Sequence, residues 1–208
     1  MSAARVLLLR HGQTNHNVER RVQGGIDIPL NDVGRAQAEE AGRALERELA
    51  DTAVRIVASD LSRALATAEA AARQLGVDVV ADSRLRERHF GQFEGLTGEE
   101  LQEKYPAEYA VWRGGDTPEL VGIETRPAVR ARMIESIEEH AEQTPDGAAL
   151  LVVSHGSAIT QALRGMLGVA ELGVPVFRGM DNCHWAELQP GSFGGGARWR
   201  LFAHNRGA

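Results

Sequence analysis

The sequence has few of the residues and patterns that mark secreted, membrane-spanning or metal-binding proteins. Cys183 is the only cysteine among 208 residues, which excludes an internal disulfide and favours a reducing compartment. No apolar run approaches the roughly 20 residues that a membrane span needs, and the first residues do not form a signal peptide. His, Cys, Asp and Glu do not recur at the spacing typical of metal ligands. We therefore expect a cytoplasmic protein with no membrane partner, no metal and no other cofactor.

Lysine is almost absent as well, and Lys104 is its only representative. The net charge of -6 argues against nucleic acid as a partner, because nucleic-acid binding usually requires a basic surface. Residues 5–21 are nevertheless locally basic, and arginine has a planar fork of donors that suits phosphate oxygens. This block therefore favours a small anionic ligand. Its basic residues are Arg5, Arg10, Arg20 and Arg21, with Glu19 as the only acid.

What is present is an ordinary globular composition with alternating strand and helix patterns. The chain is 43% hydrophobic and 25% charged, and we expect one domain over residues 1–208, without repeats or linkers. The alternation predicts a three-layer α/β/α sandwich around a mainly parallel sheet, with an antiparallel edge from a closing hairpin. Expected strands cover residues 4–9, 54–58, 77–81, the run ending at 154–155, 183–188 and 198–204. Expected helices begin at Asn31, at Ser59 or Asp60, at Thr97, near Pro127 and near Ser157.

Two aliphatic runs end in the same way. Leu7-Leu8-Leu9 leads into Arg10-His11-Gly12, and Leu150-Leu151-Val152-Val153 leads into Ser154-His155-Gly156. Continuous aliphatic runs are typical of buried parallel strands, and ligands bind at the carboxyl ends of such strands. If the two strands are neighbours, His11 and His155 meet at one edge of the sheet. The long loop after His11, residues 11–30, is expected to wall that site.

Two further blocks lie between the histidines. Ser59-Asp60-Leu61-Ser62-Arg63-Ala64 opens a helix, and Leu85-Arg86-Glu87-Arg88-His89-Phe90-Gly91 is an irregular, charged loop. Arg63 lies off the apolar stripe of its helix and in the first turn, where backbone N–H groups favour an anion. Residues 97–120 then form a helical excursion, for which packing and substrate contact are equally plausible roles.

These four blocks, in this order, resemble the histidine phosphatase superfamily, whose fold is called phosphoglycerate mutase-like. The resemblance covers nearly the whole chain and includes Gln23-Gly24 and Pro29-Leu30 after the first block. Within the superfamily, the sequence is most similar to the glucosyl-3-phosphoglycerate phosphatases. That finer similarity lies in the blocks 91–97, 182–185 and 199–201.

The resemblance implies a metal-independent phosphatase that hydrolyses a small phosphate ester through a phosphohistidine. It implies that His11 is the nucleophile, that Glu87 is the general acid, and that the transferring phosphoryl group is stabilised by Arg10, Arg63 and His155. It also implies substrate contacts from Asn17, Gln23, Gly24 and Gly156. Four of the other histidines, at 16, 89, 184 and 204, are expected to be structural.

Two features complicate these roles. Arg86 and Arg88 flank Glu87 and favour its carboxylate form. Glu87 must therefore be buried or face the substrate phosphate to act as an acid. The alternative role for Glu87 is an ion pair with those arginines. Where many relatives carry Gly-Gly-Glu-Ser, this sequence has Gly122-Ile123-Glu124-Thr125, which puts substrate contacts there in doubt.

Two other functions stay open at this point. A cofactor-dependent phosphoglycerate mutase uses the same core residues, although this chain is shorter and lacks the mutases' insertion and C-terminal tail. A non-catalytic phospholigand-binding module is the other, although it usually has a broken site, and here no core residue is missing. The alcohol portion of the substrate is not predicted, and a homodimer is compatible with the sequence.

Overall fold

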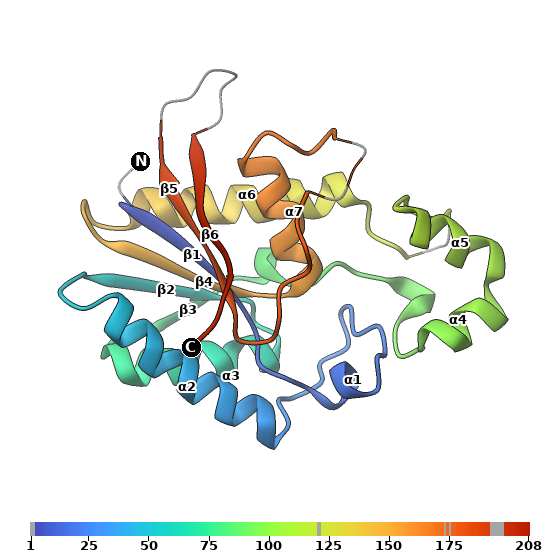
Figure 1. Cartoon of the computed structure of the whole chain (residues 1–208), viewed down its shortest axis with the longest axis horizontal. Helices are drawn as coiled ribbons and strands as arrows, with labels where there is room; N and C mark the ends of the chain where they lie inside the picture. The colour runs from blue at the N-terminus through green and yellow to red at the C-terminus, as the bar shows by residue number, and fades with distance from the viewer. Residues whose placement is uncertain (1–2, 120–121, 173, 175, 192–197) are drawn as a thin grey trace.

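The computed structural model describes residues 3–119, 122–172, 174, 176–191 and 198–208. Within them, a six-stranded sheet has the order β3-β2-β4-β1-β5-β6 (Figure 1). Its strands are β1 Arg5–Arg10, β2 Val54–Ala58, β3 Val79–Ala81, β4 Ala149–Ser154, β5 Trp185–Pro190 and β6 Trp199–Arg206. The helices are α1 Asn15–Val18, α2 Asp32–Glu48, α3 Ser62–Leu75, α4 Gly98–Lys104, α5 Pro106–Gly114, α6 Arg126–Gln143 and α7 Gly156–Met166.

The sheet is mainly parallel, as predicted. Strands β1, β2, β3 and β4 pair in parallel, and β5 and β6 add the antiparallel edge. Helices α6 and α7 cover one face of the sheet, and α2 and α3 cover the other (Figure 1). The three-layer α/β/α architecture is therefore confirmed.

Alternation along the buried strands explains the two cores. Side chains on successive strand residues point to opposite faces, so Leu8 and Val152 pack toward α6 and α7, while Leu7 and Val153 pack toward α2 and α3. All four are fully buried. Because both faces of β1 and β4 are covered, these strands read as continuous aliphatic runs in the sequence.

The predicted caps of α3 were wrong. Helix α3 begins at Ser62, and its N-cap residue is Leu61, which makes no side-chain cap hydrogen bond; Ser59 and Asp60 were the predicted caps. The carboxylate of Asp27, from the first loop, supplies the cap instead by accepting from the Ser62 backbone N–H at 2.8 Å. The loop over residues 11–30 also contains the short helix α1. The predicted turn at 194–196 lies outside the described residues.

Helices α4 and α5 project from the body of the molecule and have their own apolar cluster (Figure 1). Thr97 caps α4 with the predicted capping box. The Trp112 ring on α5 stacks edge-on against the rings of Phe90 and Phe93, at centroid distances of 6.1 and 5.9 Å. The predicted helical excursion is thus tied by aromatic packing to the segment that follows Glu87. No helix in the described part of the chain is long and apolar enough to cross a membrane.

Candidate active site

The carboxyl ends of β1 and β4 place two histidines side by side. These strands pair in parallel with Arg10 opposite Ser154, so the next residues, His11 and His155, are neighbours. Their ring centroids are 5.1 Å apart. His11 is 3% exposed and His155 is completely buried. The juxtaposition predicted from the two aliphatic runs is therefore confirmed.

One hydrogen bond fixes the tautomer of His11. Its Nδ1 lies 2.7 Å from the carbonyl oxygen of Gly12. A carbonyl oxygen only accepts, so Nδ1 carries the proton and Nε2 keeps its lone pair. The Asn182 side-chain amide donates to the His11 carbonyl at 2.9 Å and restrains the same residue from the other side. His11 is therefore set up to present a neutral, nucleophilic Nε2.

Gly12 is required by close backbone packing. A Cβ on this residue would lie 2.5 Å from the backbone oxygen of Gly34, at the start of α2. The Gly12 backbone N–H also donates to the Thr67 hydroxyl at 3.1 Å. A side chain here would displace the carbonyl that orients the His11 ring.

His155 has a defined tautomer too. Arg63 Nε donates to its Nδ1 at 3.2 Å, and an arginine nitrogen cannot accept, so Nδ1 carries the lone pair. The His155 Nε2–H then donates to the Ser59 hydroxyl at 2.9 Å. His155 is thus a neutral imidazole locked between Arg63 and Ser59, at the side of His11.

Two arginines bring positive charge to the histidines. Arg63 is fully buried and donates to the carbonyls of Gly24 and Ile26, at 2.9 and 2.8 Å. Arg10 donates to the Met180 carbonyl, and its buried Nε has no hydrogen-bond partner within the described residues. Burial lowers the pKa of both guanidinium groups, yet arginine stays charged in proteins. Neither forms an ion pair in the described part of the chain, so both charges are available to an anion.

Glu87 lies at the N-terminus of α7. Its carboxylate accepts the backbone N–H groups of Ser157 and Ala158, at 3.0 and 2.9 Å, and that of Arg88 at 2.8 Å. The flanking arginines bond elsewhere: Arg86 pairs with the Asp60 carboxylate, and the buried Arg88 donates to the Glu124 carbonyl. The ion pair considered as an alternative role for Glu87 does not form.

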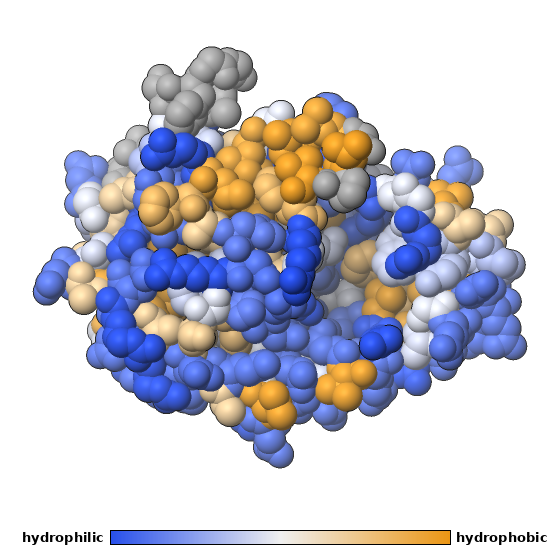
Figure 2. Space-filling view, in the orientation of Figure 1, coloured by the Kyte–Doolittle hydropathy of each residue, from blue (hydrophilic) through white to orange (hydrophobic). Residues whose placement is uncertain are grey.

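These groups surround one cavity of about 240 Å³. In Figure 2 the surface is hollowed between the body of the molecule and the part that carries α4 and α5. Trp112 lines the cavity while it packs against Phe90, so the helical excursion contributes both to packing and to the wall of the site. The predicted site residues that line it are Arg10, His11, Gln23, Gly24, Arg63, Glu87 and Gly156.

Two predicted residues are not among those that line the cavity. His155 is fully buried beside His11 and accepts a hydrogen bond from Arg63, which does line the cavity. Asn17 belongs to the capping box of α1, where its side-chain oxygen accepts the Thr14 backbone N–H at 3.0 Å. Of the four arginines in the basic block 5–21, only Arg10 reaches the cavity; Arg21, for example, pairs with Glu19 and Glu100.

Some contributors were missed from the sequence. Ser59 and Thr67 orient His155 and Gly12, and Asn182 binds the His11 carbonyl. Ser59 and Asn182 fall in blocks that carry the family resemblance, which is a usable signal. Thr67 has no such signal, because it looks like any residue on a helix face. The described residues contain no group of three or more His, Cys, Asp or Glu side chains arranged to hold a metal ion.

The buried histidines predict how stability depends on pH. Burial, with the nearby positive charges, lowers the pKa of His11 and of His155 well below the usual histidine value. In the unfolded chain that value returns to about 6.5, so below this pH the unfolded state binds more protons. The free energy of unfolding should therefore fall from pH 6.5 toward pH 5, by up to about 1.4 kcal/mol per pH unit for each histidine.

Urea unfolding at a series of pH values measures this slope. A His11→Asn/His155→Asn double variant should lose most of it, whereas His89→Asn, at a mainly exposed histidine, should keep it. A double variant with the slope of the unmodified protein would show that these two groups do not carry the effect.

Comparison with known proteins gives a consistent set of relatives. Residues 6–203 match the model of the histidine phosphatase superfamily, branch 1. A glucosyl-3-phosphoglycerate phosphatase from Mycolicibacterium vanbaalenii is 36% identical, over 100% of this chain and 97% of that protein. The enzyme of the same name from Mycobacterium tuberculosis is 34% identical, with the same coverage of both chains. The structure of a mycobacterial glucosyl-3-phosphoglycerate phosphatase in complex with VO3 has a TM-score of 0.83 at 34% identity, covering 98% of this chain and 99% of that one.

Proposed function

Because this chain belongs to branch 1 of the histidine phosphatase superfamily and is a phosphoric monoester hydrolase, we propose that His11 is its nucleophile and Glu87 its general acid. One observation carries the proposal. Because Nδ1 of His11 donates to the Gly12 carbonyl, the lone pair of Nε2 is available for attack. The Arg10 and Arg63 guanidinium groups line the same cavity and form no ion pair within the described residues. This arrangement joins a neutral nucleophile to a receptor for phosphate charge, and it needs no metal ion.

The first half of the reaction makes a phosphohistidine. His11 Nε2 attacks phosphorus, an N–P bond forms, and the bond between phosphorus and the ester oxygen breaks. Glu87 gives its proton to the departing alkoxide. Arg10 and Arg63 stabilise the charge on the phosphoryl oxygens. His155 contributes by holding the Arg63 guanidinium in place.

The second half returns the enzyme to its starting state. A water molecule attacks phosphorus from the side that the alcohol has left, and the Glu87 carboxylate accepts its proton. The N–P bond breaks, inorganic phosphate forms, and His11 recovers its neutral ring. The backbone N–H groups of Ser157 and Ala158 stabilise the Glu87 carboxylate between the two halves.

The general-acid role of Glu87 predicts a loss that depends on the leaving group. Glu87→Gln keeps the shape of the side chain but removes the acidic proton that the alkoxide needs. We expect kcat/KM for an alkyl phosphate to fall about 10²–10⁴-fold. p-Nitrophenyl phosphate should lose far less, because its phenolate leaves without protonation. The measurement is kcat/KM for both esters. Equal losses on the two would remove Glu87 from the acid role.

For the substrate we propose glucosyl-3-phosphoglycerate. The proposal is supported by full-length relatives of that name at 34–36% identity and by a cavity whose two arginines suit an anion. Among alternatives, a mutase would return the phosphoryl group to a sugar acid. The relatives named as mutases or mutase-like match less of the chain: a phosphoglycerate mutase-like protein covers 88% of it at 31% identity, and a probable phosphoglycerate mutase covers 79% at 35% identity. A non-catalytic module is disfavoured because the nucleophile, acid and arginines are all present.

A substrate panel without added metal tests this choice. It contains glucosyl-3-phosphoglycerate, 3-phosphoglycerate, phosphoserine, sugar phosphates, nucleotides and α-ribazole phosphate, ranked by kcat/KM, which measures discrimination between competing substrates. Glucosyl-3-phosphoglycerate should rank first. A different best ester would overturn only the named substrate. Interconversion of 2- and 3-phosphoglycerate far faster than release of phosphate would overturn the phosphatase itself.

A further inference from the structure

Glu87 lies on a segment that has no regular secondary structure to position it. Between the 3₁₀ helices Ser83–Leu85 and Gly91–Phe93, the chain makes no strand pairing except an isolated bridge from Phe90 to Ile123. Backbone carbonyls in such a segment need other partners. A general acid, however, must be held within hydrogen-bond reach of the oxygen that it protonates. Something other than a helix or a strand must therefore fix this backbone.

Side chains of two neighbouring elements bind four successive carbonyls, two at the end of the first 3₁₀ helix and two in the segment that follows it. The Ser154 hydroxyl, at the end of β4, donates to the Leu85 carbonyl at 2.7 Å. Arg132, on α6, donates to the carbonyls of Arg84 and Arg86, each at 2.7 Å, and to that of Glu87 at 3.1 Å. The backbone that carries the acid is thus wrapped around one guanidinium group.

The Arg132 guanidinium uses all of its donors. Besides the three carbonyls, its Nε and Nη2 donate to the Glu124 carboxylate at 2.7 and 2.8 Å. A guanidinium has five N–H donors in a rigid fork, and here each has an acceptor. Lysine has three donors on a point charge and cannot reproduce this set.

Glu124, the ion-pair partner of Arg132, also binds the residues that follow Glu87. Its backbone N–H donates to the His89 carbonyl at 2.9 Å, its carboxylate accepts the His89 N–H at 3.2 Å, and its carbonyl accepts from Arg88 Nε at 2.7 Å. Residues on both sides of Glu87 are therefore held by hydrogen bonds from the Arg132–Glu124 pair. The stretch 122–125, where the sequence departs from the family pattern, contributes this acid and the Thr125 cap of α6.

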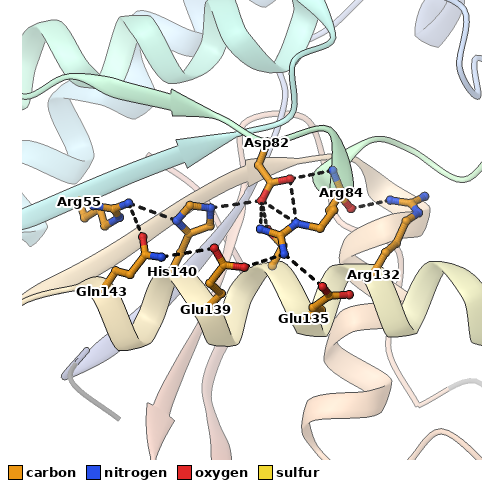
Figure 3. A network of polar contacts seen from close by, with 9 residues as sticks. Arg55, Asp82, Arg84, Arg132, Glu135, Glu139, His140 and Gln143 are labelled. Carbon is orange, nitrogen blue, oxygen red and sulfur yellow. Dashed lines mark hydrogen bonds and ion pairs between the residues drawn. The ribbon is translucent and has the colours of Figure 1, made fainter.

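A second set of contacts anchors the start of the segment to the same helix (Figure 3). The Asp82 carboxylate accepts from Ser136 at 2.7 Å, from His140 at 3.2 Å and from Arg84 at 2.7 Å. Figure 3 shows His140 and Arg132 on α6, with His140 directed toward Asp82 and Arg132 toward the Arg84 backbone. Asp82 fixes where the segment begins, and Arg132 fixes the turn that presents Glu87.

We propose that Arg132, held by Glu124, is a positioning residue for the general acid: it places the Glu87 carboxyl beside the ester oxygen. The inference rests on the proposed role of Glu87. Arg132 does not line the catalytic cavity, so it acts through the backbone of residues 84–87. A displacement of about 1 Å in a reacting group costs about 10²-fold in rate. The loss should fall on the step that needs the acid.

The test replaces Arg132 by methionine, which keeps the aliphatic stem and removes the five donors. Arg132→Met should lower kcat/KM about 10²-fold for the best alkyl phosphate of the panel and only slightly for p-nitrophenyl phosphate. A residue needed only for folding would lower both alike. Adding Arg132→Met to Glu87→Gln should cost little more on the alkyl ester than Glu87→Gln alone, because the acid is already gone.

Two further variants keep the result interpretable. Arg130→Met, on the same helix, removes a guanidinium that pairs with the exposed Glu171, and it should leave both esters unchanged. Arg132→Lys should recover part of the alkyl activity; if Arg132→Met does not fold, the split is measured on Arg132→Lys. Equal losses on the two esters, or additive losses in the double variant, would overturn the positioning role. If Glu87→Gln itself shows no split between esters, the proposed acid fails instead.

Discussion

His11→Ala is expected to abolish turnover and to leave the fold in place. Without Nε2 there is no atom to accept the phosphoryl group, and loss of the covalent nucleophile of a serine protease lowers kcat by about 10⁶-fold. The side chain follows the end of β1 and makes one side-chain hydrogen bond, to Gly12, so its removal leaves the strand and both cores intact. Steady-state hydrolysis of p-nitrophenyl phosphate measures the loss.

Circular dichroism and thermal unfolding of the same variant provide the control. His204→Ala, at a histidine of β6 outside the cavity lining, should retain full activity. If His11→Ala kept most of its activity while folded, another group would have to be the nucleophile.

Arg63→Ala is expected to lower kcat/KM about 10²–10³-fold for alkyl and nitrophenyl esters alike, the cost of losing one preorganised transition-state donor. Charge on the phosphoryl oxygens develops with either leaving group, so this loss should not depend on the ester. The variant should also be less stable, by about 1–3 kcal/mol for each buried group left unpaired. Those groups are the carbonyl of Gly24 and the Nδ1 of His155.

The matched control lies on the same helix. Arg73→Ala removes an exposed guanidinium that pairs with Glu39, and both activity and stability should stay close to those of the unmodified protein. Arg63→Lys should restore little activity, because an ammonium cannot bond His155, Gly24 and Ile26 at once. A large recovery in the lysine variant would show that charge, and not the fork of donors, is what the site uses.

Several strand ends and helix caps could be predicted because their signals are local. The run Val54–Ala58 is a strand over the predicted residues, and Asn31 caps α2 as expected. His11 and His155 come together because each follows a buried aliphatic run, and parallel pairing needs only that the two strands be neighbours. The architecture and the centre of the site were therefore accessible from sequence patterns.

Tertiary contacts were not accessible in this way. Ser59 and Asp60 look like helix caps, but Ser59 bonds His155 and Asp60 pairs with Arg86, so the Asp27 carboxylate caps α3 from the first loop. No local pattern connects Asp27 to a helix that begins 35 residues later. The burial of Arg88 and the hydrogen bond from Arg132 to the Glu87 carbonyl could not be predicted for the same reason, because both depend on contacts between distant segments.

Rapid-quench labelling tests the central claim most directly. The enzyme is mixed with a ³²P-labelled ester, stopped within milliseconds, and digested for mass spectrometry. We predict an acid-labile, alkali-stable phosphoryl group on His11, formed and lost at rates that account for turnover, and absent from His11→Ala. Label on any other residue, or turnover without label under conditions that preserve phosphohistidine, would contradict the account.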